Sequence, residues 1–394
     1  MIYVTRYRQV HEQQITFEEI LMNFENKKLF TNPTPNTTNQ TITRVYDEST
    51  AQTRSRMPVM PGTITVRLHA FNKRWEYLRS QDRQSLYHTF YIPKAKGGLR
   101  RIDEPNADLM TALRELKELL ESCGLIHHTA AYAYVKSRCT QDALKMHQRN
   151  KSEWFLKTDL SNFFGSTTLE FVMNQFAHIY PMSDVVTPYG DVSVYRGDHY
   201  ERYCGKEELA KALELGFLNG GLPQGTPLSP ALTNWIFVPI DYTLMKEFAA
   251  RKLVYTRYAD DMLISAQEKF PKEITIEIIN NTMKQFNAPY VLKQEKTRFG
   301  SNKGENWNLG LMLNGNNEIT VGHKNKKFFK AMVNSFILDR INNHPWDKED
   351  VQQLAGLYSY YQKIEKNYFD HVICTFNHKY GVNFNAMLRN ALRQ

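Results

Sequence analysis

Two adjacent carboxylates, Asp260 and Asp261, lie between two runs of β-branched and aromatic residues, and this stretch constrains the fold more than any other. The flanking runs, 253–257 and 262–265, have the composition of strands, which places the acids at a hairpin tip. Like charges on a tight turn repel each other unless a cation lies between them. Mg²⁺ prefers carboxylate oxygens and leaves coordination positions for substrate phosphates. The pair alone is compatible with a solvated surface turn and with a metal site.

A third carboxylate favours the metal site. Asp159 ends the apolar run 154–159, which has the composition of a buried strand. An acid at a strand end and an acid pair on a neighbouring hairpin can hold two metal ions, which stabilise the attacking and leaving oxygens of a phosphoryl transfer. Between these acids, the run 221–230 is rich in Gly and Pro. It predicts a loop leading into a helix, with Ser229 as N-cap and Pro230 as the first helical residue.

The order of these motifs resembles the palm of bacterial reverse transcriptases of the retron, group II intron and phage-defence kind. The motifs are the strand acid, the Gln224-Gly225 loop and the Tyr258-Ala259-Asp260-Asp261 hairpin. The resemblance implies an α+β right-hand polymerase whose palm is an antiparallel, RRM-like sheet that carries the acidic hairpin. It implies fingers at 72–150, a palm at 151–320 and a helical thumb at 321–394. Residues 1–71 form an extension that either braces the fingers or binds RNA or a partner.

The resemblance also implies the metal ligands and a proton donor. Asp159, Asp260 and Asp261, with the backbone carbonyl of Leu160, are expected to hold two Mg²⁺ ions, for which Mn²⁺ is a possible substitute. Lys296 lies in a Lys-Thr motif after the hairpin and is a candidate general acid for the leaving pyrophosphate. An ordinary solvated lysine is the alternative interpretation of the same residue.

A second set of residues is expected to bind the incoming dNTP. Arg100 matches the fingers residue that grips the triphosphate, because a guanidinium offers a bidentate fork. Lys94 or Lys96 assists, and the sequence does not choose between them. Phe164 matches the aromatic position that faces the sugar, where a ring excludes a ribose 2′-hydroxyl and favours deoxynucleotides. The remaining residues assigned to this site are Gln224, Gly225 and Tyr258.

Basic residues indicate a polyanionic partner. The chain carries a net charge of +9 and has a pI near 9.1. Lys136 and Arg138 are expected to contact the template backbone. The first thumb helix is expected to bind the template–primer duplex through a basic patch, which consists of Lys324, Lys326, Lys327 and Lys330.

The sequence also predicts several local features. The sequence predicts a helix through 75–87, a hairpin around Gly97-Gly98 and a capping box at 167–170. Phe163 is expected to point away from Phe164 on a strand and to be part of the core. His147 is interpreted as a hydrogen-bonded helix residue rather than a catalyst.

Composition indicates a cytoplasmic protein with no membrane partner. The four cysteines have no close pair, so they form neither a zinc knuckle nor a disulfide framework, which fits a reducing compartment. The first residues lack an apolar signal core. No apolar run approaches the roughly 18 residues that a membrane span needs.

Departures from family patterns favour one branch. Asn308-Leu309-Gly310 stands where retron enzymes carry Val-Thr-Gly, and 174–178 matches their Asn-Ala-x-x-His motif imperfectly. Diversity-generating enzymes carry Ser-Gln where this chain has Ser229-Pro230. Group II intron proteins add maturase and endonuclease regions after the thumb. What remains resembles stand-alone, defence-associated enzymes that copy a dedicated non-coding RNA into cDNA, with an effector or second subunit as a further candidate partner.

The same residues disfavour some alternative functions and leave others open. An inactive RNA-binding scaffold is disfavoured by the intact Asp159, Asp260 and Asp261. An RNA-dependent RNA polymerase is disfavoured by Phe164. A retron-type or group II intron-type reverse transcriptase, and an untemplated or protein-primed DNA polymerase, remain open alternatives.

Overall fold

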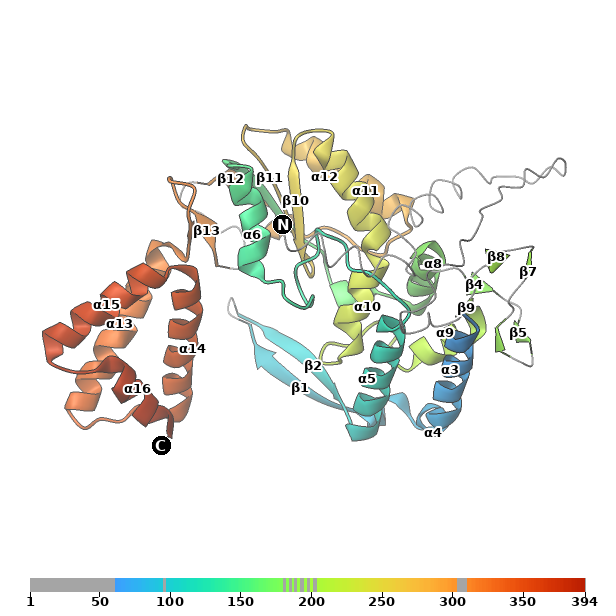
Figure 1. Cartoon of the computed structure of the whole chain (residues 1–394), viewed down its shortest axis with the longest axis horizontal. Coiled ribbons are helices and arrows are strands. Elements are labelled where there is room, and N and C mark those ends of the chain that lie inside the picture. Colours follow the sequence, from blue (N-terminus) through green and yellow to red (C-terminus); the bar gives the residue numbers. More distant parts are fainter. Residues whose placement is uncertain are drawn as a thin grey trace, which may run out of the picture. The chain divides into compact units, whose positions relative to one another are not determined.

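The computed structural model describes residues 61–94, 97–179, 204–302 and 310–393, together with short strands between residues 182 and 200 (Figure 1). For 61–63 and for these short strands, only the backbone is described. Most of the N-terminal extension, Lys96 and residues 307–309 lie outside the described residues. Among the described helices, none combines the length and the apolar character that a membrane crossing requires.

The chain divides into two compact units, and neither is a continuous segment. Unit 1 comprises Met1–His128, Asn162–Tyr242 and Thr282–Tyr290. Unit 2 comprises Thr129–Ser161, Thr243–Asn281 and Val291–Gln394. The contiguous ranges expected for fingers, palm and thumb remain a prediction.

Unit 2 is built on a four-stranded antiparallel sheet. Its strand order is β10-β11-β3-β12, so β3 lies between two strands that come much later in the chain. The strands are β10 (Val254–Tyr258), β11 (Asp261–Ala266), β3 (Trp154–Asp159) and β12 (Arg298–Ser301). Helix α6 (Thr140–Arg149) packs against β10. The predicted acidic hairpin and the strand ending at Asp159 are thus confirmed.

His147 joins α6 to two strands of this sheet. It is fully buried, and its Nε2 and Nδ1 lie 2.8 Å from Thr256 Oγ1 and 2.5 Å from Ser265 Oγ. Because Ser265 donates its hydroxyl proton to Ser152 at 2.7 Å, Nδ1 donates to Ser265 and Nε2 accepts from Thr256. Burial lowers the pKa of His147 to about 3. The interpretation of His147 as a satisfied structural residue is confirmed.

The C-terminal part of unit 2 is helical, as predicted. It follows the pair β13 (Met312–Leu313) and β14 (Ile319–Thr320) and continues the apolar core of the sheet, in which Phe155 and Leu263 take part. Phe329 packs edge-on against Phe369, with ring centroids 5.1 Å apart. The helices are α13 (Gly322–Ile341), α14 (Lys348–Ile364), α15 (Lys366–Tyr380) and α16 (Phe384–Arg393).

Unit 1 combines helices with a two-stranded hairpin. The hairpin pairs Tyr87 with Pro105 at one end and Pro93 with Leu99 at the other, and Gly97 and Gly98 have positive φ near its tip. Its strands are β1 (Tyr87–Pro93) and β2 (Leu99–Pro105). The main helices are α3 (Pro61–Arg74), α4 (Glu76–Arg79), α5 (Ala107–Glu121), α7 (Phe163–Ser166), α8 (Leu169–Ile179), α9 (Lys206–Glu214) and α10 (Leu228–Ile236). Helices α11 (Val238–Ala249) and α12 (Lys272–Gln285) contribute residues to both units.

Short elements complete the description. A 3-10 turn, Arg83–Leu86, precedes the hairpin, and another, Gln294–Lys296, precedes β12. The six other strands in the described residues have two residues each and form three pairs, of which β5 and β6 are antiparallel around residue 190. They are β4 (Met182–Ser183), β5 (Val186–Thr187), β6 (Gly190–Asp191), β7 (Tyr195–Arg196), β8 (His199–Tyr200) and β9 (Cys204–Gly205).

The helix predicted through 75–87 forms only in part. Helix α4 covers Glu76–Arg79, a 3-10 turn follows at Arg83–Leu86, and β1 already begins at Tyr87. The interruption lies at Asp82, whose carboxylate accepts from the Ser85 N–H at 3.1 Å and caps the 3-10 turn. A side chain that caps a new turn thus overrides the continuous helical pattern of the sequence.

Two predicted caps are wrong. Helix α10 begins at Leu228, because Thr226 Oγ1 accepts from the Ser229 backbone N–H and Ser229 Oγ donates to the Pro223 carbonyl. At α8 the cap is Thr168, whose hydroxyl accepts from the Phe171 N–H, and not a capping box at 167–170. A cap depends on which hydroxyl the backbone reaches, and neighbouring Ser and Thr residues make that choice ambiguous.

Candidate active site

The three predicted acids lie at one end of the unit 2 sheet. Asp159 ends β3 and is the direct antiparallel partner of Asp261, the first residue of β11. Residues opposite each other in an antiparallel pair point to the same face. Asp260 lies in the two-residue turn between Tyr258 and Asp261, and its carbonyl accepts from the Leu160 N–H at 3.1 Å. The register of the sheet therefore brings acids together that are far apart in the sequence.

The turn itself has an unusual backbone. Ala259 has a φ of +57°, in the left-handed region that residues with a side chain rarely adopt. Buried Arg257 donates from Nη1 to the Ala259 carbonyl at 3.1 Å, and its backbone N–H donates to the Ala130 carbonyl. Packing of the surrounding chain thus holds a sparsely populated conformation at the acid pair, as is common at functional sites.

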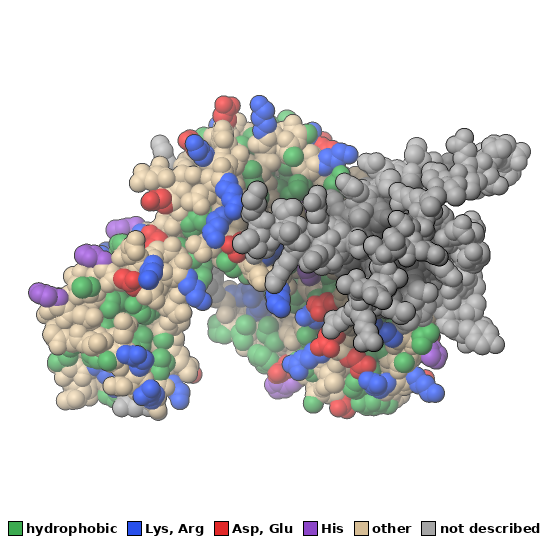
Figure 2. Space-filling model, in the orientation of Figure 1, with side chains coloured by type: hydrophobic (Ala, Val, Ile, Leu, Met, Phe, Trp, Pro, Cys, Tyr) green, Lys and Arg blue, Asp and Glu red, His purple; other side chains and the backbone are tan. Residues whose placement is uncertain are grey.

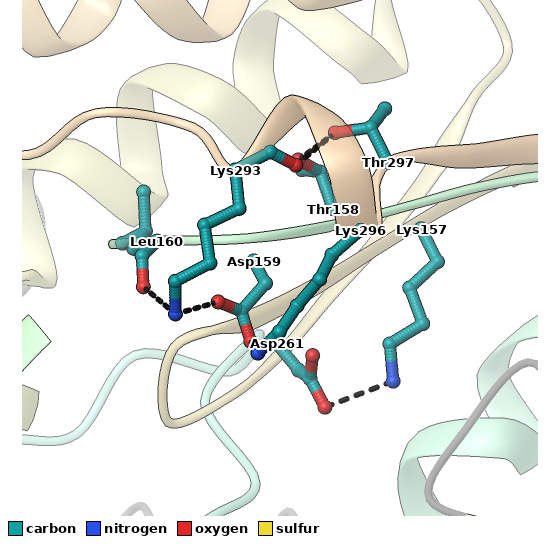
Figure 3. A network of polar contacts seen from close by, with 8 residues as sticks. All are labelled: Lys157, Thr158, Asp159, Leu160, Asp261, Lys293, Lys296 and Thr297. Atoms are coloured by element: carbon teal, nitrogen blue, oxygen red, sulfur yellow. Dashed lines mark hydrogen bonds and ion pairs between the residues drawn. The ribbon is translucent and has the colours of Figure 1, made fainter. Parts of the chain in front are cut away.

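Three lysine ammonium groups neutralise the acids (Figure 3). Lys157, on the same strand face as Asp159, contacts Asp261 Oδ2 at 2.9 Å. Lys293 contacts Asp159 Oδ1 at 2.5 Å, and Lys296 contacts Asp159 Oδ2 at 3.0 Å. Of these three lysines, only Lys296 was predicted from the sequence, and Lys157 and Lys293 were not. The only local sequence signs were a lysine two positions before the strand acid and the Lys-x-x-Lys spacing.

Burial and neighbouring charges shift the pKa values of two residues in the cluster. Burial and the negative charge of Asp159 raise the pKa of Asp260 to about 6. Although burial lowers it, the hydrogen bond to Asp159 raises the pKa of Lys296 above its ordinary value. The Lys296 ammonium is therefore protonated at neutral pH.

The donor set fits a divalent cation. Two facing carboxylates, a third in the adjoining turn and the Leu160 carbonyl supply hard oxygen ligands. In the described part of the chain, no group of three His, Cys, Asp or Glu side chains is arranged to hold a metal ion. The three acids would therefore have to move closer together to bind one. Asp159 and Asp261 are paired with lysines instead.

In unit 1, the predicted nucleotide residues lie on three linked elements. The Asp103 N–H, on β2, donates to the Gln224 carbonyl at 2.7 Å. The Leu222 N–H donates to the Phe164 carbonyl at 2.9 Å, which attaches the same loop to α7. Gly225 has a φ of +118°, and a Cβ there would lie 2.8 Å from the Asp103 carbonyl oxygen. At Gly225 it is therefore the hairpin backbone that lies close to the loop.

The hairpin and α7 present their side chains differently. Lys94 and Arg100 are exposed on the hairpin, whereas Phe164 is half-buried. Phe163 lies in the core, as predicted, but on the short helix α7 rather than on a strand. Figure 2 shows hydrophobic side chains gathered over the hairpin. The exposed ones are Phe90, Tyr91, Ile92 and Leu99.

The predicted nucleic-acid contacts separate into free and engaged residues. Lys136, Lys324 and Lys327 are exposed. Arg138 donates to the Ala131 carbonyl at 2.7 Å, so its guanidinium braces its own loop. Lys326 pairs with Glu365, the residue that precedes α15.

Glu365 and Tyr368 hold two of the thumb lysines. Lys326 Nζ contacts Glu365 Oε1 at 2.5 Å and lies 4.2 Å from the centre of the Tyr368 ring. Lys330 lies 5.4 Å from the same ring. Glu365 also accepts from the Val321 N–H at 3.0 Å, so this cluster fixes the start of α13. Half of the predicted basic patch thus has a structural partner.

Carboxylates gathered at one end of an antiparallel sheet are typical of metal-dependent phosphoryl-transfer enzymes. Residues 92–328 match the family described as reverse transcriptase (RNA-dependent DNA polymerase). The match covers more than half of the chain, so the chain belongs to this family and is an RNA-directed DNA polymerase with an α+β right-hand fold. The predicted superfamily, fold class and activity are confirmed.

The chain is similar to curated relatives and, weakly, to solved structures. The retron Ec83 reverse transcriptase of Escherichia coli is 26% identical over 298 residues, which cover 75% of this chain and 87% of the relative. The retron Ec73 enzyme of the same organism is 26% identical over 300 residues, or 71% of this chain and 86% of the relative. A telomerase from Candida albicans has a TM-score of 0.39 at 11% identity, covering 83% of this chain and 68% of its own. That score is too low to carry an argument.

Proposed function

We propose that the acid cluster is the polymerisation site, at which a primer 3′-hydroxyl attacks the α-phosphate of a dNTP and pyrophosphate leaves. The observation that carries the proposal is the register that pairs Asp159 with Asp261 and places Asp260 in the adjoining turn. Membership of the family indicates the reaction, and the three acids at this end of the sheet are the carboxylates that could hold its metal ions.

Each residue of the cluster has a distinct task. Asp159, Asp260 and the Leu160 carbonyl would hold two Mg²⁺ ions, which supply positive charge for the attacking and leaving oxygens. Asp261, the antiparallel partner of Asp159, has a supporting role. Lys296 donates a proton to the leaving pyrophosphate, a task for which its raised pKa keeps it charged.

The nucleotide is held by residues of unit 1. Arg100 and Lys94 are exposed cations on one hairpin, and a guanidinium suits a triphosphate. Backbone hydrogen bonds tie this hairpin to Gln224 and tie the loop to Phe164, so the three elements act as one support. The Phe164 ring selects a deoxyribose at this support. Tyr258, on the acidic hairpin of unit 2, is also proposed to bind the nucleotide.

The template is a dedicated, structured non-coding RNA, and the enzyme is of the retron type. The similarity to two retron reverse transcriptases across most of their length supports this branch over the stand-alone branch that the sequence motifs favoured. The charge of +9 and the exposed Lys324 and Lys327 suit a nucleic-acid partner. A role in antiphage defence, with an effector as partner, follows from the family resemblance.

The first experiment tests the acid cluster with Asp260→Asn. Primer extension is expected to fall at least about a hundredfold, because a carboxylate that would hold the metal ions loses its charge. The melting temperature is expected to stay the same or rise, since the folded protein disfavours the charged form of Asp260. Glu268→Gln, an exposed carboxylate beyond the other end of β11, is the matched control. Extension at the wild-type rate by Asp260→Asn would exclude this site.

The second experiment identifies the template. The enzyme is purified from cells that carry its native locus, and the bound nucleic acid is sequenced after RNase or DNase treatment. One abundant RNA with complementary DNA supports a dedicated template. DNA without a complementary RNA would instead point to untemplated or protein-primed synthesis. Phage challenge of cells with wild-type or Asp260→Asn enzyme tests the defence role, since only the active enzyme is expected to protect.

A further inference from the structure

Lys293 lies at the position where the proposed metal ligands converge. Its Nζ contacts Asp159 Oδ1 at 2.5 Å and the Leu160 carbonyl oxygen at 3.4 Å. In Figure 3 its ammonium group points between these two oxygens. They are the same carboxylate and carbonyl that are expected to bind a divalent cation. Lys296 takes the other Asp159 oxygen.

The backbone holds Lys293 firmly at this position. The Lys293 N–H donates to the Asp159 carbonyl at 2.9 Å, and Leu292 forms a β-bridge with Leu160. Thr297 Oγ1 donates to the Lys293 carbonyl at 2.8 Å. The Lys293 side chain exposes 24% of its surface, compared with 54% for Lys296. Lys293 is therefore less exposed to solvent than Lys296, and its backbone is held close to the Asp159 and Leu160 oxygens.

An ammonium group and a divalent cation seek the same oxygen ligands, so they exclude each other from one position. We propose that Lys293 is a positioning residue that occupies part of the metal site in the metal-free enzyme and leaves it when the divalent cation binds. This proposal rests on the proposed function of the acid cluster. It makes Lys293 a competitor of the metal and, at the same time, a residue that stabilises the acid cluster when no metal is bound.

The two roles predict opposite effects of Lys293→Met, which keeps the length of the side chain and removes its charge. Without the competitor, Mn²⁺ is expected to bind roughly tenfold more tightly, because one charged hydrogen bond no longer has to be broken. In EDTA the variant is expected to melt at a lower temperature than wild type, since Asp159 loses a partner. A purely structural lysine would weaken metal binding and stability together.

The measurement is Mn²⁺ binding to the full chain without nucleotide, followed by electron paramagnetic resonance, with melting temperatures in EDTA. Lys157→Met is the matched control, because it removes the same charge from the same sheet face but contacts neither Asp159 nor Leu160 in the structure. Its effect on Mn²⁺ affinity is expected to be clearly smaller. Lys293→Arg keeps the charge and is expected to bind Mn²⁺ about as weakly as wild type.

The outcomes separate this inference from the proposed function. Weaker Mn²⁺ binding by Lys293→Met, or equal effects of Lys293→Met and Lys157→Met, would overturn the exchange of lysine for metal. A Mn²⁺ site that Asp260→Asn abolishes would, in that case, still support the proposed function. Mn²⁺ binding that is unaffected by Asp260→Asn would overturn the metal assignment and the inference with it.

Discussion

His147 offers a quantitative test of how the sheet that carries the acids is held. It is fully buried on α6 and bridges Thr256 of β10 and Ser265 of β11, the two strands of the acidic hairpin. His147→Gln keeps a donor and an acceptor but does not reproduce the geometry of the ring. At pH 7.5 the change is expected to lower the free energy of unfolding by about 1–3 kcal/mol, the cost of leaving a buried hydroxyl poorly paired.

The pH dependence of this effect follows from the pKa of His147. Burial holds it near 3 in the folded protein, whereas an unfolded histidine has a pKa of about 6.5. Between these values the unfolded chain binds a proton that the folded chain does not, so stability falls as the pH drops below about 6.5. At pH 5.0, about 1.5 units below the unfolded pKa, the loss is about 2 kcal/mol at roughly 1.4 kcal/mol per unit.

The assay is urea unfolding of wild type and His147→Gln at pH 7.5 and pH 5.0. Other titrating groups affect both proteins equally, so the difference between them isolates His147. The free-energy gap between the two proteins is expected to shrink by about 2 kcal/mol at pH 5.0, because the variant does not carry this titration. His371→Gln, at an exposed position of α15, is expected to leave stability unchanged at both pH values. A gap that is the same at both pH values would refute a buried neutral histidine.

Two further changes test the nucleotide support in unit 1. Gly225→Ala places a Cβ 2.8 Å from the Asp103 carbonyl oxygen at a φ of +118°, so we expect strain of about 1–3 kcal/mol and a raised KM for dNTP in primer extension. Gly356→Ala, with open space around it, is the control, and an unchanged KM in Gly225→Ala would contradict the role of this contact. Phe164→Ala is expected to raise ribonucleotide incorporation relative to deoxynucleotides. Equal discrimination by wild type and variant in competition assays would remove Phe164 as the sugar gate.

Local sequence patterns were sufficient where one segment decides the outcome. The β-branched runs on either side of Asp260 predicted the acidic hairpin, and the Gly97-Gly98 pair predicted the hairpin of β1 and β2. The predictions failed where several side chains compete for the same backbone or where a distant partner decides. Asp82 accepts from the Ser85 N–H and so interrupts the helical run predicted through 75–87. The contact of Gly225 with β2 follows only from the tertiary fold.

The same distinction explains why the acids were found and two of their lysines were not. A pair of adjacent carboxylates is conspicuous because it is costly without a cation, so it indicates a site even in isolation. A lysine is chemically ordinary until the fold gives it a partner. Lys157 and Asp261 are 104 residues apart, and Lys293 and Asp159 are 134 residues apart. A shift of one residue in the pairing of β3 with β11 would turn Lys157 to the opposite face of the sheet. The charge balance of the site is therefore a property of the sheet register, and mutations that disturb that register are expected to affect metal binding even where all three acids are kept.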